Sequence, residues 1–234
     1  MDFRVEDDFR NIFPHARIGI LICTNINNQR DGSFDYQVLL DEHIDLAKKL
    51  LEAPVFSENE VIKVWRQAFQ QFKTKKGARS SIEALLKRVD KNKGVVSINP
   101  LVDIYNAISL KYGFPCGGED IDTFVGDVRL TLANGNEDFL PLGENDVSLP
   151  FEGEVIYKDD IGAICRCFNW REAARTMLTE KTINALMVLE SIDPNRNREF
   201  EEALEELKIL IENHLGGQVS LYIMEKDKKS QKIK

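Results

Sequence analysis

The segment CRCFNWRE, residues 165–172, gathers side chains that could bind an anion or a base. Arg166 and Arg171 offer planar guanidinium forks, and Asn169 and Trp170 lie between them. Guanidinium groups beside an aromatic ring suit a carboxylate, a phosphate or a stacked nucleobase. The sequence also allows a structural interpretation, in which the tryptophan is buried at a strand end and the arginines pair with acids such as Asp159 and Asp160. Both interpretations stay open.

A second polar segment, GFPCGGEDID at residues 113–122, places two glycines and two acids after a cysteine. A glycine-rich loop built on Gly117 and Gly118 can aim backbone N–H groups at a ligand. Glu119 and Asp120 can orient a water molecule beside it. Cys116 is a poor candidate nucleophile, because the acids that follow it raise a thiol pKa.

The segment TEKTINALMVLE, residues 179–190, adds two hydroxyls and a carboxylate to a mostly apolar stretch. The hydroxyls belong to Thr179 and Thr182, and the carboxylate to Glu190. A carboxylate in apolar surroundings is either paired within the protein or used to bind a ligand.

Several classes of protein lack support in the sequence. Neither phosphate-cradling glycine motif occurs, and no GxSxG nucleophile elbow is present. Four cysteines are too sparse for a disulfide scaffold, and three scattered histidines show no zinc spacing. Cys165 and Cys167, two apart on an expected strand, should face one side. We predict no metal and no cofactor, and the absence of a leader or a long apolar run favours a cytoplasmic protein that binds no membrane.

Charge is unevenly distributed along the chain, whose formal net charge is −8. Residues 63–93 hold ten Lys and Arg against two acids, whereas residues 94–165 hold thirteen acids against three bases. A basic block of this kind is either an ordinary solvated face or a contact for a polyanion such as nucleic acid.

Periodicity predicts an α+β fold, with helices mainly in the first half packed on a mixed or antiparallel sheet from the second half. Expected helices cover 41–51, 59–72, a segment that begins at the Ser80 capping box, 100–112 and 200–211. Asn99 and Pro100 are typical of a helix start and Gly113 of a helix stop. Expected strands cover 18–26, 127–133, 154–157, 163–168 and 219–224. Residues 184–192 fit a strand or a helix, and the DPN turn directly after them favours a strand. Residues 226–234 are expected to form a frayed basic tail.

The segments SINPLVDIYNAISLKYGFPCGGEDID, GDVRLTLANGNEDF, ICRCFNWRE and LTEKTINALMVLE, in this order, resemble the B3/B4 domain of the β subunit of bacterial phenylalanyl-tRNA synthetase. The resemblance covers roughly residues 60–224, and it implies a free-standing member of the family. It implies an N-terminal extension over 1–58, a B3/B4-like domain over 59–225 and the tail after it.

In the synthetase this domain hosts an editing pocket that hydrolyses tyrosine wrongly esterified to the tRNA for phenylalanine. The resemblance therefore implies a pocket between two subdomains, with Asn99 and Asp103 at the base of the pocket-forming helix. Glu190 would match the acid that contacts the misplaced amino acid. The family's Pro-x-His pattern is absent, because Gly117 stands where the histidine is expected. The same editing mechanism is thus in doubt.

Three hypotheses remain: an editing hydrolase acting in trans on mischarged aminoacyl-tRNA, a binding module for RNA or aminoacyl-tRNA without chemistry, and a site for a free amino acid without RNA. The sequence does not determine the oligomeric state. The candidate catalytic residues are Asn99, Glu119, Asp120 and Glu190. The candidate substrate-binding residues are Asp103, Gly117, Gly118, Arg166, Asn169, Trp170, Arg171, Thr179 and Thr182.

Overall fold

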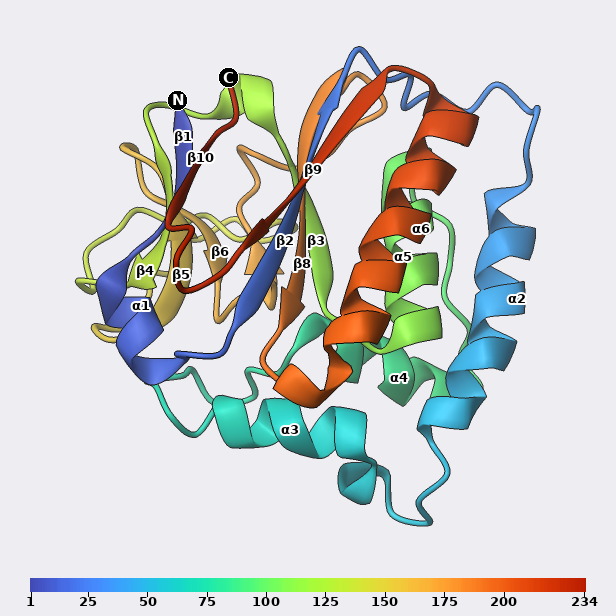
Figure 1. Cartoon of the computed structure of the whole chain (residues 1–234), viewed down its shortest axis with the longest axis horizontal. Coiled ribbons are helices and arrows are strands. Elements are labelled where there is room, and N and C mark those ends of the chain that lie inside the picture. Colours follow the sequence, from blue (N-terminus) through green and yellow to red (C-terminus); the bar gives the residue numbers. More distant parts are fainter.

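A four-stranded antiparallel sheet forms the middle layer of the computed structural model, which describes residues 1–234 (Figure 1). Its order is β3 (Cys116–Asp120), β8 (Asn184–Ser191), β2 (Arg17–Thr24) and β9 (Gln218–Met224). The apolar run in β2 is buried on both faces because helices cover one side and a second sheet covers the other. The expected strands near 18–26, 184–192 and 219–224 are thereby confirmed.

Three helices cover the outer face of this sheet: α2 (Tyr36–Ala47), α5 (Pro100–Tyr112) and α6 (Asn197–Leu215). A side chain at Gly19 in β2 would lie 2.4 Å from the Leu204 side chain of α6, so the glycine allows the helix to approach closely. Nearly all of α5 is buried, since α2 and α6 flank it. Both ends of α5 lie where the sequence predicts them. Asn99 caps the first turn, and Gly113, at φ +72°, ends the last turn.

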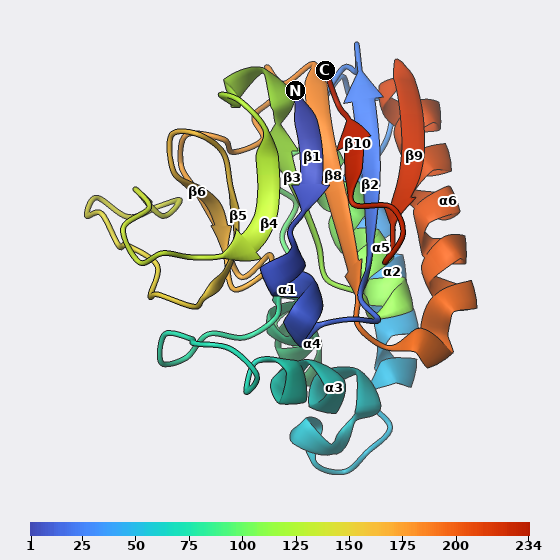
Figure 2. The same ribbon diagram turned by 60° about the vertical axis from the view of Figure 1, so that its left-hand side comes forward.

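The second sheet is six-stranded and mixed (Figure 2). Its order is β10 (Ser230–Lys232), β1 (Asp2–Val5), β4 (Val128–Leu132), β5 (Val155–Lys158), β6 (Ala163–Arg166) and β7 (Arg171–Glu172), with β1 and β4 parallel. Helices α1 (Asp7–Ile12), α3 (Glu60–Ala68) and α4 (Ser81–Asp90) lie at the lower end in Figure 2. Four short 3-10 helices complete the fold: Lys48–Leu50, Phe56–Glu58, Ile121–Thr123 and Pro194–Arg196.

The predicted α+β class is confirmed, and several details of the prediction are corrected. There are two sheets, and the first half of the chain supplies β1 and the interior strand β2. The second helix begins earlier than expected because Asp35 accepts from the N–H groups of Gln37 and Val38. The C-terminal tail is not frayed, since Ser230–Lys232 pairs with β1 and buries Ile233.

The prediction that Cys165 and Cys167 face one side of a strand is wrong. Strand β6 ends at Arg166, and Cys167 has a φ of +46°. The two thiols therefore reach different carboxyl groups, with Cys165 donating to Glu119 and Cys167 to Glu154.

A cluster of aromatic rings packs the turn after β6 against helices α1 and α3. Phe168 lies at its centre and contacts five rings, at centroid distances from 5.2 to 6.2 Å, of Phe9, Phe13, Trp65, Phe69 and Phe72. The rings come from α1, from the turn that follows it, and from α3 and the turn after α3. Phe168 itself has a φ of +59°, a backbone conformation that bulky residues rarely adopt. Burial of its ring offsets this strain.

None of the helices combines the length and the apolar character that crossing a bilayer requires.

Replacing Phe168 with alanine should lower the free energy of unfolding by about 3–5 kcal/mol, because the ring is almost fully buried among aromatic neighbours. Phe151→Ala is the matched control, since Phe151 is 43% exposed and its loss should cost much less. Urea unfolding followed by circular dichroism measures both. Equal losses would contradict a central role for Phe168.

Candidate functional site

The segment GFPCGGEDID ends helix α5 and continues into an edge strand, so the prediction of a glycine-rich loop is wrong. Residues Cys116–Asp120 pair with β8, with Gly117 opposite Val188. The N–H of Glu190 donates to the carbonyl of Pro115 at 3.0 Å. Hydrogen-bonded pairs alternate along an antiparallel ladder, so Gly117 bonds to Val188 and the amides of Cys116 and Gly118 point away from β8. The free N–H groups therefore belong to these two residues and not to Gly117.

A groove of about 380 Å³ lies at the start of this edge of β3, beside Cys116, whereas further along the edge Glu119 pairs with Met177 and the Asp120 N–H donates to the Thr176 carbonyl oxygen. One wall comes from α4 and α5, and the other from the turn that joins β6 to β7 together with a leucine of the β4–β5 connection. Its lining residues are Ser81, Ala84, Leu85, Tyr105, Asn106, Cys116, Leu142, Asn169, Trp170, Arg171 and Glu172. The structure thus brings Asn169, Trp170 and Arg171, which the sequence singled out, to one wall.

Asn169 packs against Gly117 directly behind the strained turn at Phe168. A Cβ atom at Gly117 would lie 2.6 Å from the Asn169 side-chain oxygen, so any larger residue would displace the amide. The Asn169 side chain is 8% exposed and lies beside the Glu190 carboxyl group, where its amide partly offsets the rise in pKa that burial causes. Gly117 and Asn169 therefore determine the shape of the groove together.

Three carboxyl groups lie behind and beside this pair: Glu119 on β3, Glu172 on β7 and Glu190 on β8. Cys165 donates to Glu119 at 2.9 Å, and the Tyr157 hydroxyl donates to Glu190 at 2.7 Å. Thr176 lies beside Glu119 and Asn169 lies beside Glu190, and each lowers the pKa of its neighbour against the larger effect of burial. The two sheets thus meet at a set of buried acids surrounded by polar side chains of both sheets.

Burial dominates the electrostatics of these acids. It raises the pKa of Glu190 to about 8 and the pKa of Glu172 to about 7. Burial, and then the charge of Glu172, raises the pKa of Glu119 well above its ordinary value. Removing a carboxylate from water disfavours its charged form, and like charges nearby add to the effect. Near neutral pH the cluster therefore holds protons that isolated glutamates would have lost.

The pKa of the Cys116 thiol is also raised, as the sequence predicted, but for a different reason. Burial and then Glu190 raise the pKa of its thiol, and the adjacent acids Glu119 and Asp120 are not the main cause. A fully protonated thiol at neutral pH is a wall of the groove and not a nucleophile.

Glu172 is the functional candidate that the sequence reasoning missed. It ends the CRCFNWRE segment, it is half-buried, and it lines the groove. The two-residue strand β7 pairs it with Cys165, which places its side chain on the face of the sheet that carries Cys165 and hence near Glu119. A strand of two residues is too short to show a periodic pattern in the sequence. The position of Glu172 two residues after Trp170 was the one sequence feature that pointed to it.

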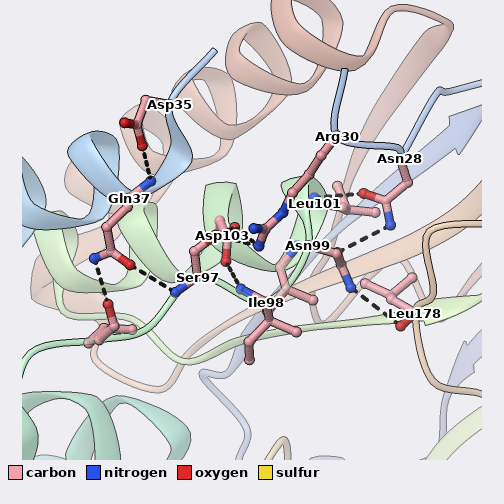
Figure 3. A network of polar contacts seen from close by, with 12 residues as sticks. Asn28, Arg30, Asp35, Gln37, Ser97, Ile98, Asn99, Leu101, Asp103 and Leu178 are labelled. Carbon is pink, nitrogen blue, oxygen red and sulfur yellow. Dashed lines mark hydrogen bonds and ion pairs between the residues drawn. The ribbon is translucent and has the colours of Figure 1, made fainter. Parts of the chain in front are cut away.

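Asn99 and Asp103 lie in a different place, at the N-terminus of α5 (Figure 3). Asn99 accepts from the Val102 N–H at 3.1 Å and from the Asn28 amide at 3.2 Å. Asp103 accepts from Ser97 and from the Ile98 N–H, and it lies 3.6 Å from Arg30. Helix α5 has 13 residues and is about 20 Å long, so this network is separated from Glu190, which bonds to the chain just after the helix.

Asp120, Thr179 and Thr182 lie outside the groove lining, in a small network that Asn28 connects to Asn99 by donating to the Thr179 carbonyl oxygen at 2.8 Å. The Thr182 hydroxyl donates to Asp120 at 2.8 Å and accepts from the Thr179 N–H at 3.0 Å. Asp120 also caps the 3-10 helix that follows β3. These contacts link the end of β3 to the turn that precedes β8.

The arginines of CRCFNWRE use partners other than the expected Asp159 and Asp160. Arg166 is buried in a two-pronged ion pair with Glu154, at 2.7 Å for both contacts. It follows Cys165 in β6 and so points to the opposite face of the sheet from the groove. Arg171 is exposed, pairs with Glu144 and lies over the Trp170 ring at 5.3 Å.

Part of the basic block 63–93 borders the groove. Ser81, Ala84 and Leu85 line it from α4, and Arg88 follows at the spacing that continues the same face. Arg88, Lys91 and Lys93 are exposed at the end of this helix. Arg66, by contrast, is neutralised by Glu83 at 2.7 Å. No three His, Cys, Asp or Glu side chains are arranged to hold a metal ion.

Comparison with known proteins adds a family to this geometry. The model of the B3/4 domain family matches residues 64–207. The β subunit of the phenylalanine–tRNA ligase of Psychrobacter arcticus is 36% identical over 98 residues, which are 42% of this chain and 12% of that subunit. The subunit of Shewanella oneidensis is 35% identical over 66 residues, 28% of this chain and 8% of that subunit. The matches therefore span only about a tenth of these relatives.

Among solved structures, an N-terminal fragment of the phenylalanyl-tRNA synthetase β subunit from Pyrococcus horikoshii is similar over 93% of this chain and 49% of the fragment. The TM-score is 0.45 and the sequence identity is 12%.

The raised pKa of Glu190 predicts a pH-dependent stability. Because the folded state keeps a proton on this acid that the unfolded chain loses above its ordinary pKa of 4.5, stability should fall as the pH rises from about 5 to 8. The contribution is up to about 1.4 kcal/mol per pH unit. Glu190→Gln cannot ionise and should flatten this slope, whereas Glu180→Gln, on an exposed glutamate, should leave it unchanged.

Urea unfolding at pH 5.5 and pH 8 measures the slope. An identical slope in the wild type and in Glu190→Gln would show that Glu190 does not hold its proton in the folded state.

Proposed function

This chain belongs to the B3/4 domain family, whose model matches more than half of it, and we propose that it binds the aminoacylated end of a tRNA in the groove beside β3 and hydrolyses the ester. The observation that carries the proposal is the position of Glu172 in the groove lining together with its raised pKa. Its carboxyl group lies on the groove wall with a pKa of about 7, which suits a general base at neutral pH.

The proposed reaction is hydrolysis by one water molecule. The ionised carboxylate of Glu172 takes a proton from the water, whose oxygen forms a bond to the ester carbonyl carbon. The bond between that carbon and the ribose oxygen then breaks, and the leaving oxygen receives the proton. A carboxyl group with a pKa near the working pH can both accept and return this proton.

The edge of β3 supports the charge that develops on the carbonyl oxygen. The amide of Cys116 points away from β8, and Cys116 lines the groove. Fixed N–H donors beside a developing oxyanion are among the larger contributions to catalysis of acyl transfer. Gly117 offers no imidazole, so in this proposal a carboxylate takes the part of the base.

The groove walls also fit the two ends of such a substrate. Trp170 is half-buried with the Arg171 guanidinium group over its ring, and both flat groups are of the kind on which a terminal base can stack. The exposed Arg88 and Lys91 continue from the α4 wall and can meet phosphates. The candidates that remain in this proposal are Gly117, Gly118, Glu119, Asn169, Trp170, Arg171, Glu172 and Glu190.

Incubation of the purified protein with a panel of mischarged tRNAs should reveal deacylation above the spontaneous rate for at least one of them. Glu172→Gln should then lower kcat/KM about 100-fold, since it removes a general base. Glu180→Gln is the matched control and should have no effect. Activity should rise with pH through about 7, because the base must be ionised. No deacylation of any tRNA, or full activity of Glu172→Gln, would contradict the proposal.

A second candidate function is a binding module that has the fold without the chemistry. It is favoured by the burial of Glu119 and Glu190 and by the Tyr157 hydroxyl, which already occupies one oxygen of Glu190. On this view the acids shape the groove and do not react.

The binding module predicts an affinity for tRNA that falls steeply with salt, because neutralised phosphates release counterions. Arg88→Glu should weaken binding and reduce the slope of log K against log salt by about one. Glu180→Lys, which changes charge away from the groove lining, is the control. Absence of tRNA binding, combined with an increase in melting temperature on adding one free amino acid, would favour the amino-acid site instead.

A further inference from the structure

A second cavity, lined in part by α3, shares none of the lining residues of the groove. Its volume is about 360 Å³, within the range of small-molecule sites. Seven of its fifteen lining residues are hydrophobic: Leu50, Ala53, Val61, Val64, Trp65, Phe114 and Ile192. It is bounded by the 3-10 helix Lys48–Leu50 and the loop after it, by α3, and by the segment that leads from β8 to α6.

The absence of a side chain at Gly113 keeps this cavity open. A Cβ atom there would lie 2.9 Å from Val61 and 3.1 Å from Leu50, both of which line the cavity. The φ of Gly113 is +72°, so the same glycine also ends α5. The residue that ends α5 therefore lies directly against two apolar side chains of the cavity wall.

The charged groups at the rim are mostly acidic. Four acids, Glu52, Glu60, Asp193 and Glu199, face two bases, Lys49 and Arg196. Arg196 is already neutralised, because it pairs with Glu199 at 2.5 Å and lies over the Phe114 ring at 4.2 Å. Glu60 lies 3.9 Å from Lys63.

Asp193 is the acid best placed to bind a cation. It is half-buried, it forms no ion pair within the chain, and only one of its side-chain oxygens is used, by the Asn195 N–H at 2.9 Å. Trp65 lines the same cavity, and aromatic faces attract ammonium groups, whereas the Phe114 ring already has the Arg196 guanidinium group over it. An apolar body with one positive charge therefore complements both the walls and the rim.

We propose that this cavity is a binding site for a small apolar primary amine, with the apolar part between Val64, Trp65 and Phe114 and the ammonium group at Asp193. The site is independent of the groove beside β3, so its occupant does not depend on the function proposed for that groove.

The probe is phenethylamine, with phenylacetate as the isosteric anion, and isothermal calorimetry and thermal denaturation are the measurements. Phenethylamine should bind saturably and raise the melting temperature, because it binds only the folded state. Phenylacetate should not bind, since an anion would meet the acidic rim.

Two variants locate the site. Asp193→Asn keeps the cap on Asn195 and removes the charge, and it should raise the Kd for phenethylamine about fivefold. Ala53→Phe fills the cavity from a loop position and should abolish binding. Ala84→Phe, on the groove wall, is the matched control and should bind phenethylamine as the wild type does.

Three results would overturn the proposal: no binding of phenethylamine, equal binding of phenylacetate, or an unchanged Kd in Asp193→Asn. Circular dichroism shows whether Ala53→Phe folds, and the conservative Asp193→Asn carries the test if it does not.

Discussion

The burial of the Phe168 ring is the interaction on which the arrangement of the candidate site depends. Cys167 and Phe168 both hold positive φ angles, which are unfavourable for residues with side chains. Five surrounding rings, contributed by α1, α3 and their adjoining turns, provide the apolar contact that offsets this strain. The turn in this conformation directs Asn169 against Gly117 and carries Trp170 and Glu172 to the groove.

The second constraint is the removal of three glutamate side chains from water, which affects both their acidity and the stability of the fold. Bringing Glu119, Glu172 and Glu190 together between the sheets disfavours their charged forms and raises their pKa values. A carboxyl group with a pKa near 7 is useful for proton transfer, but the same burial weakens the folded state as the pH rises. The Tyr157 hydroxyl and the Cys165 thiol each donate to one carboxyl oxygen, and Asn169 and Thr176 lie beside Glu190 and Glu119. Carboxyl groups with perturbed pKa values beside a groove are typical of functional sites.

The structure divides the residues that the sequence singled out into two groups. The N-terminus of α5 holds Asn99 and Asp103 in a network with Asn28 and Ser97 that joins three segments of the chain (Figure 3). The groove at the other end of the fold holds Gly117, Asn169 and the acids. A helix of 13 residues separates the two ends, so residues that are close in the motif need not share a pocket.

Features that depend on local interactions were determined by the sequence itself. The cap at Asn99, the helix stop at Gly113, the side-chain cap at Ser80 and the apolar strand around Ile20 all follow from neighbours within a few residues. The ordered motifs were also enough to identify the family. Only the tertiary structure decided that Cys116–Asp120 is an edge strand, that Ser230–Lys232 pairs with β1, and that Glu172 lies beside Glu119. Strand pairing and the burial of charge depend on partners far away in the chain, and no local pattern records which partner a strand or a carboxyl group will meet.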